Sequence, residues 1–267
     1  MLAGVGRLIR IYVKLQLLHL RIPLEYEADF WILVFGVGLS QCVGLVFIGA
    51  VFAKVPHING WGLWEVVLMY SMMTIGQGCS ELFAEGSWDL PMLVNRGELD
   101  RMLVRPYPVI LQVCSFRLGM NAFGTLAVGT VLLVTALARL HVHWTPARAA
   151  IALLVFASAL VVKVSLTVIA NASAFWLRGT ISTFAAGADQ LGDLTRYPLT
   201  IYGVGLRAFL STAVPFAFVG FFPAAWVLGH GQSAWVGLLT PLAAAYCVTV
   251  AVLAFRFGLR RYDSAGN

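Results

Sequence analysis

The sequence predicts an all-α membrane protein, a single domain over residues 1–267 with six transmembrane helices. The chain is 60% hydrophobic and only 11% charged, whereas soluble domains carry about 25% charged residues. A bilayer core requires about 20 apolar residues per helix. Six apolar runs approach or exceed that length, at 30–52, 61–83, 110–138, 149–176, 199–215 and 234–256.

The first element, over residues 5–22, is predicted to be an amphipathic helix that lies on the membrane surface. Its cations gather on one side of a helix that turns about 100° per residue. They are Arg7, Arg10, Lys14 and Arg21. Such a helix is attracted to an anionic leaflet, and Pro23 ends it. The same cations interrupt any signal-peptide core.

The first span contains small residues at steps of four, namely Gly36, Ser40 and Gly44. A stripe of this kind lets a second helix approach closely. Two interpretations stay open, a tight interface with another subunit or ordinary packing within one chain.

Residues 85–108, between the second and third spans, form the most charged segment of the chain. The charged residues are Glu85, Asp89, Arg96, Glu98, Asp100, Arg101 and Arg105. Leucine, valine and methionine recur between them at helical spacing, which predicts one apolar and one charged face. Asp89 followed by Leu-Pro indicates a helix start, and Gly97 divides the helix before Pro106 stops it. We therefore expect a partner-binding helix from Asp89 to about Arg105.

The distribution of arginine and lysine predicts that both termini and the 85–108 segment face the cytoplasm. The predicted cytoplasmic side holds the four N-terminal cations and Arg96, Arg101, Arg105, Arg178, Arg196, Arg256, Arg260 and Arg261. The other side holds only Lys54, Arg139 and Arg148. On this basis residues 178–196 are expected to form a second cytoplasmic element.

Three further residues are candidates for a translocation path or a helix interface. Lys163 lies near the middle of the fourth span, where a charge marks function unless a polar group inside the bundle pairs with it. Pro215 and Pro223 break the long apolar run that begins at Pro198. Because irregular backbone at membrane depth must be buried or line a cavity, we expect a re-entrant hairpin over 216–231 on the outer side.

Several chemistries have no support in the sequence. The three lysines follow Val13, Ala53 and Val162, so the chain lacks the Gly-Lys of a P-loop and is not expected to hydrolyse ATP. The pair His141 and His143 has no third ligand, so no metal site is predicted. No basic run or aromatic motif predicts nucleic-acid binding. All twelve carboxylates are expected in loops or near span ends, which argues against an ion-coupled transporter.

The pattern resembles the permease subunit of ABC type-2 exporters, and in particular a bacterial branch with two related permeases and a separate ATPase. The first matching run, residues 97–106, is GELDRMLVRP, which is similar to that branch's G-x-L-D-x-x-L-x-R-P. The second comprises Tyr197-Pro198-Leu199 with Ile201-Tyr202, then residues 214–218 and 222–224. Lys163 and the small-residue stripe match no family motif.

The resemblance implies a homo- or heterodimer of permeases in the membrane lipid of a bacterial cell membrane, above cytoplasmic ATPase subunits. ATP and magnesium would bind the ATPase, so no cofactor is expected in this chain. The helix between the second and third spans would couple ATP hydrolysis to transport. The residues assigned to that coupling are Asp89, Arg96, Glu98, Leu99, Asp100, Arg101, Met102 and Arg105. The expected activity is efflux, and the alternative is a stand-alone secondary transporter or channel. The resemblance does not define the solute; apolar spans with few charges at mid-membrane favour an amphipathic or hydrophobic one, such as a drug, an antibiotic or a lipid-like compound.

Overall fold

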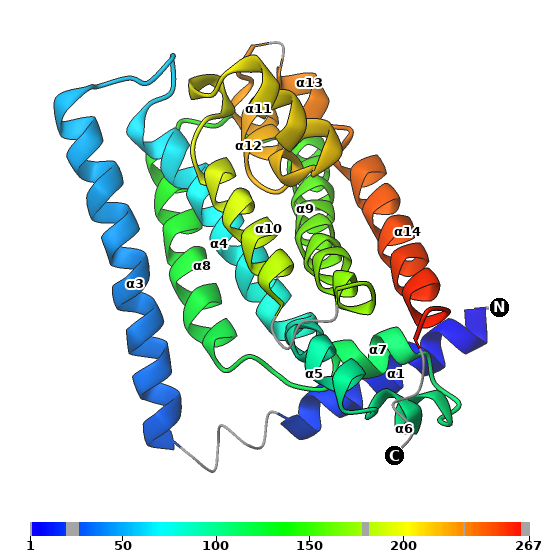
Figure 1. The fold of residues 1–267 in the computed structure, drawn as a ribbon. Coiled ribbons are helices and arrows are strands. Elements are labelled where there is room, and N and C mark those ends of the chain that lie inside the picture. The colour runs from blue at the N-terminus through cyan, green and yellow to red at the C-terminus, as the bar shows by residue number, and fades with distance from the viewer. Residues whose placement is uncertain (1, 20–26, 178–181, 232, 263–267) are drawn as a thin grey trace.

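The structure is a computed structural model, and it describes residues 2–19, 27–177, 182–231 and 233–262 (Figure 1). Within these ranges the regular elements are helices, with an isolated β-bridge between Ile58 and Trp61. Four helices are long and apolar enough to cross a membrane. They are α3 from Phe30 to Lys54, α8 (Asn121–Arg139), α9 (Pro146–Ala172) with the 3-10 turn η2 (Ser173–Phe175), and α14 (Thr240–Leu259).

These four helices pack as a bundle around α4 (Leu63–Phe83). Every residue of α4 from Val66 to Gly76 is buried, which makes it the centre of the bundle between α8 and α9 (Figure 1). Helix α14 packs on the far side of α9, whereas α3 (Glu27–Lys54) lies at the edge (Figure 1). Helix α10 (Thr183–Asp193) also runs along the bundle, beside α9, and continues into η3 (Leu194–Arg196).

Short helices gather at one end of the bundle, which we call the connector end (Figure 1). They are α1 (Leu2–His19), η1 (Glu85–Asp89), α5 (Leu90–Asn95), α6 (Leu99–Leu103) and α7 (Val109–Cys114). Two hydrogen bonds fasten α1 to the last turn of α4. The Tyr12 hydroxyl donates to the carbonyl of Phe83, and Gln16 Nε2 donates to the carbonyl of Leu82 at 3.1 Å. A helix is therefore present where 5–22 was predicted, although residues 20–22 lie outside the described residues.

The opposite end carries a second group of short helices (Figure 1). They are η4 (Leu199–Ile201), α11 (Val204–Ala208), the π-helical turn η5 (Phe209–Ala213), η6 (Phe216–Phe218), α12 (Phe221–Leu228) and α13 (Ser233–Gly237). Asn59 Nδ2 donates to the Thr200 carbonyl at 2.9 Å, and Arg148 donates to the Val227 carbonyl at 2.9 Å. These bonds join the group to the loop between α3 and α4 and to the first turn of α9.

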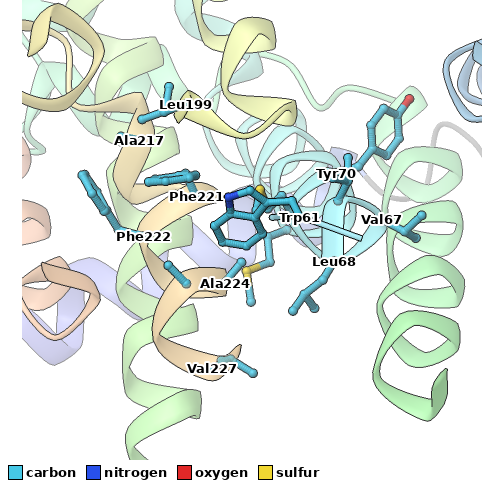
Figure 2. Close-up of a cluster of buried hydrophobic side chains, with 14 of the residues drawn as sticks. Trp61, Val67, Leu68, Tyr70, Leu199, Ala217, Phe221, Phe222, Ala224 and Val227 are labelled. Carbon is cyan, nitrogen blue, oxygen red and sulfur yellow. The ribbon is translucent and has the colours of Figure 1, made fainter. Parts of the chain in front are cut away.

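An aromatic core holds this group on α4. Figure 2 shows the Trp61 indole against Phe221, with 5.5 Å between ring centroids, and Ala224 close by. The other face of the Trp61 ring stacks on His230 at 4.2 Å. Burial of such rings is the main source of stability of this end, since each aromatic side chain removes about 150–250 Å² from solvent.

Three predicted spans differ from the observed helices. The run 110–138 is divided into α7 and α8, because residues 115–120 turn where Gly119 lies against the Glu81 backbone. The run 199–215 forms three short helices at the opposite end, because Pro198 and Gly203 interrupt it. The longitudinal element in this part of the chain is α10, within residues 178–196 that were expected to be a cytoplasmic loop. The run 234–256 is likewise divided into α13 and α14.

Candidate functional site

The segment between α4 and α7 is a helix–turn–helix, and its local sequence explains the shape. Pro91 occupies the first turn of α5, where no amide donor is needed. Gly97 has φ of 68°, a left-handed conformation that glycine adopts without steric cost. Its amide donates to the Val94 carbonyl, and the amide of Glu98 donates to the Leu93 carbonyl. This pair of bonds is a Schellman motif, which ends α5 and turns the chain into α6.

The predicted coupling residues divide into a buried and an exposed group. Leu99 and Met102 are buried, with Leu90 and Leu93, against Phe175 and Phe255 at the ends of η2 and α14. They hold α5 and α6 on the bundle and cannot contact a partner directly. The exposed residues of the set are Arg96, Arg101 and Arg105, while Asp89, Glu98 and Asp100 are half-buried.

An ion-pair cluster joins η1 to the turn between α7 and α8. Arg117 contacts Glu85 at 3.2 Å and Asp89 at 3.4 Å, so Asp89 serves this contact and makes no side-chain cap on α5. Burial raises the pKa of both carboxyl groups above their ordinary values, and the Arg117 guanidinium partly opposes that rise. No sequence pattern predicted that Arg117 pairs with these residues.

Close backbone packing fixes the same region. A side chain at Gly86 would meet the carbonyl oxygen of Val113, so η1 and α7 approach as only glycine permits. Gln112 of α7 donates to the carbonyls of Met102 at 2.9 Å and Tyr107 at 2.7 Å. The connector is therefore attached to α7 by side-chain and backbone contacts together.

A charged pair lies inside the bundle. The side chain of Lys163 is 2% exposed and forms an ion pair with Asp189 of α10, whose side chain is 29% exposed. The Lys163 ammonium also lies 5.5 Å from the ring centre of Phe216, directly after Pro215. Of the two interpretations of Lys163 that the sequence left open, the structure shows a partner inside the bundle.

A second polar cluster joins α3, α4 and η3. Arg196 forms an ion pair with Asp193 at 2.9 Å. Its Nη1 donates to Gln41 Oε1 at 3.3 Å and to the Tyr70 hydroxyl at 3.2 Å. Gln41 is central in α3, about 20 Å from either end at 1.5 Å per residue. Figure 2 shows the Tyr70 hydroxyl pointing away from the aromatic core, and this hydroxyl is the group that bonds to Arg196. The side chain of Asp193 is 54% exposed.

These two clusters correct the expectation that every carboxylate lies in a loop or near a span end. The Asp189 carboxylate pairs with Lys163, which lies nine residues before the end of α9. The Asp193 carboxylate pairs with Arg196, whose guanidinium also donates to Gln41. Sequence reasoning did not place Asp189 inside the bundle because its segment, TFAAGADQLGD, is polar, and it did not single out Gln41 or Tyr70. The available signal was Lys163, which required a counter-ion inside the bundle.

The small-residue stripe faces two environments. Gly36 has open space where a side chain would lie, and Ser40 is exposed, whereas a side chain at Gly44 would collide with the Tyr70 hydroxyl. The stripe is therefore an intrachain contact at Gly44 alone. Around the exposed part, α3 presents large apolar side chains that are mostly exposed, including Phe35, Leu39 and Val43.

The remaining candidate residues lie at the opposite end. Pro223 is buried within α12, and Pro215 begins η6. His141 and His143 are exposed between α8 and α9. In the described ranges no group of three or more His, Cys, Asp or Glu side chains is placed to hold a metal ion.

Comparison with known proteins adds one match. A sequence profile of the family described as "ABC-2 family transporter protein" matches residues 39–266. The matched region begins within α3 and includes the helix–turn–helix, both polar clusters and the aromatic core. No match was found among curated proteins or among solved structures.

Proposed function

The chain belongs to the ABC-2 family transporter proteins, and we propose that it is the permease subunit of an ATP-driven exporter. Membership of this family makes the chain the membrane component of an ABC-2 type transporter. Export as the direction of transport, the ATPase partner and the class of cargo are our proposal. A separate ATPase subunit would supply ATP hydrolysis at the connector end. A second permease, identical or related, would complete the path through a bacterial cell membrane.

The observation that carries the proposal is the construction of the connector end. Buried leucines of α5 and α6 pack in one cluster with Phe175 of η2 and Phe255 of α14, while Arg96 is exposed. A rigid element that contacts several long helices at once is able to transmit a push from a soluble partner to the bundle. We therefore propose that α5 and α6 form the coupling element and that Arg96 contacts the ATPase.

The direction of each long element supports a six-span topology with both termini in the cytoplasm. The helices α3, α4, α8, α9, α10 and α14 alternate in direction along the bundle (Figure 1). Tyr262, which follows α14, packs against the buried cluster that contains the leucines of α5 and α6, and Tyr12 of α1 packs against the same cluster. In this proposal α10 with η3 replaces 199–215 as the fifth span, and the helices around Pro215 and Pro223 form the outer gate.

The exposed charge on α10 supports a path between two permeases. A charged side chain at the bilayer centre costs about 2.5–3.5 kcal/mol on insertion scales, so the half-exposed Asp193 is not expected to face lipid. Asp193, together with the apolar side chains of α3 such as Leu39 and Val43, would give the wall of the path both charged and apolar surface. This combination favours an amphipathic solute as cargo.

The experiment is ATP-dependent transport by the purified permease reconstituted with its partner ATPase. Arg96→Glu is expected to reduce transport at least tenfold while the chain still inserts and folds. Lys54→Glu is the matched control, because Lys54 is an exposed cation at the opposite end. Equal transport by Arg96→Glu and the control would remove α5 from the coupling role.

The same preparation decides between the exporter and a stand-alone secondary transporter. Asp189 and Asp193 are the observation that favours the alternative, because ion-coupled transporters place carboxylates at membrane depth. Transport that continues without ATP and follows an imposed ion gradient would establish the alternative. A cysteine at Asn95 tests the topology, since an impermeant thiol reagent should label it only from the cytoplasmic side.

A further inference from the structure

We propose that a pocket at the connector end binds the phosphoglycerol headgroup of an anionic membrane lipid. The pocket has a volume of about 340 Å³ and lies between α1, α6 and α7. Its polar lining comes from His19, Glu98, Arg101, Arg105, Gln112 and Ser115. None of these residues belongs to the two polar clusters in the bundle.

The pocket lies where lipid headgroups are found. Helix α1 forms one wall, and its hydrogen bonds to the last turn of α4 hold it at the end of a long helix of the bundle. Beside the pocket residue Leu15, the side chains of Leu17 and Leu18 are exposed. A helix that exposes leucines next to basic groups is typical of the membrane interface. Acyl chains would pack on these leucines while the headgroup enters the pocket.

Two arginines supply the charge for the phosphate. Arg101 and Arg105 line the pocket, and neither forms an ion pair with any residue in the described part of the chain. A guanidinium offers a planar set of donors that matches phosphate oxygens. The one acidic group in the lining, Glu98, leaves a net positive pocket that favours a monoanionic phosphodiester.

The other polar groups indicate hydroxyl donors on the ligand. Gln112 is 6% exposed, and both of its described hydrogen bonds are donated by Nε2, which leaves Oε1 as an acceptor without a partner. A buried acceptor without a partner costs free energy, and a phosphate oxygen cannot supply the proton. The glycerol hydroxyls of the headgroup can donate to the Glu98 carboxylate, and to Gln112 Oε1 once that buried amide turns toward the pocket. A headgroup with an ammonium would bring a cation toward Arg101 and Arg105, so the uncharged donor fits better.

The experiment is native mass spectrometry of the full-length chain, delipidated in detergent and titrated with phosphatidylglycerol or phosphatidylcholine. The wild type is expected to bind phosphatidylglycerol at least tenfold more tightly than phosphatidylcholine. The variant R101Q/R105Q is expected to lose that preference. R96Q is the matched control, because Arg96 is an exposed arginine of the same connector outside this pocket, and it should bind as the wild type does. Monodisperse size-exclusion profiles verify folding, and R105Q alone replaces the double variant if that variant aggregates.

Four results would overturn the proposal. The first is equal binding of the two lipids, and the second is an equal loss of phosphatidylglycerol binding in R96Q and R101Q/R105Q. The third is competition by free glycerophosphoglycerol at the concentration at which the lipid binds. The fourth is that R101Q/R105Q loses co-purification of the ATPase while its lipid binding stays intact. The third result would assign the pocket to a soluble phosphate, and the fourth would make these arginines ATPase contacts. The readout requires no ATP or transport, so it is independent of the exporter proposal.

Discussion

Removal of the Asp189 carboxylate tests whether the interior ion pair holds α10 on α9. Lys163 is almost fully buried, whereas Asp189 keeps 29% of its side-chain exposure. Removing one partner of a buried pair costs about 3–5 kcal/mol, because it leaves a buried charge without compensation. We expect Asp189→Asn to cost about 3 kcal/mol, the low end of that range, since partial exposure screens the charges. Lys163→Met leaves a charge that reaches solvent, so we expect a smaller loss of about 1 kcal/mol.

The double variant Lys163→Met/Asp189→Asn separates pairing from general damage. Replacing both members of a buried pair is often nearly neutral, so the double variant should be more stable than Asp189→Asn alone. The difference from additivity is the coupling energy of the pair.

Thermal unfolding of the purified variants in one detergent measures this order. Exposure of the buried thiol of Cys247 in α14 to a thiol-reactive fluorophore reports the loss of packing. A value for Asp189→Asn equal to that of the wild type would refute the reasoning. So would a double variant whose loss equals the sum of the single losses, because the two residues would then act independently.

Three other perturbations test the connector end by the same unfolding assay. Gly86→Ala should destabilise by about 1–3 kcal/mol through overpacking. Gly187→Ala is the control and should be neutral or stabilising, because Gly187 has open space in the interior of α10. Equal stability changes in the two variants would contradict the close approach of η1 and α7. Leu99→Ala should cost about 2–5 kcal/mol because Leu99 is fully buried, whereas Val104→Ala, at an 83% exposed position, should stay within about 0.5 kcal/mol; a similar loss in both would place α6 off the bundle. Burial raises the pKa of Glu85 in the folded state. The contribution of Glu85 to stability is therefore greatest at low pH, and it falls as the pH rises from the ordinary glutamate pKa through the raised one. Glu85→Gln should flatten the plot of stability against pH in that window, and an unchanged slope would show that another group titrates there.

Local sequence was sufficient for the connector helices because their signals are short-range. Pro91 at the start, Gly97 at the turn and the spacing of Leu90, Leu93 and Leu99 act within one or two helical turns. The sequence could not divide the charged residues into those that face a partner and those that do not. That division depends on tertiary contacts, such as the one that Arg117 makes with Glu85 from 32 positions away.

Composition and hydropathy by themselves determined that this protein is all-helical and embedded in a membrane, because apolar length is a property of the chain. The tertiary structure decided which segment runs beside α9. The prediction chose 199–215 for its hydropathy, whereas the structure places the polar helix α10 there. The physical reason is pairing, because Asp189 beside Lys163 and Asp193 beside Arg196 offset charges that would exclude the segment on composition alone.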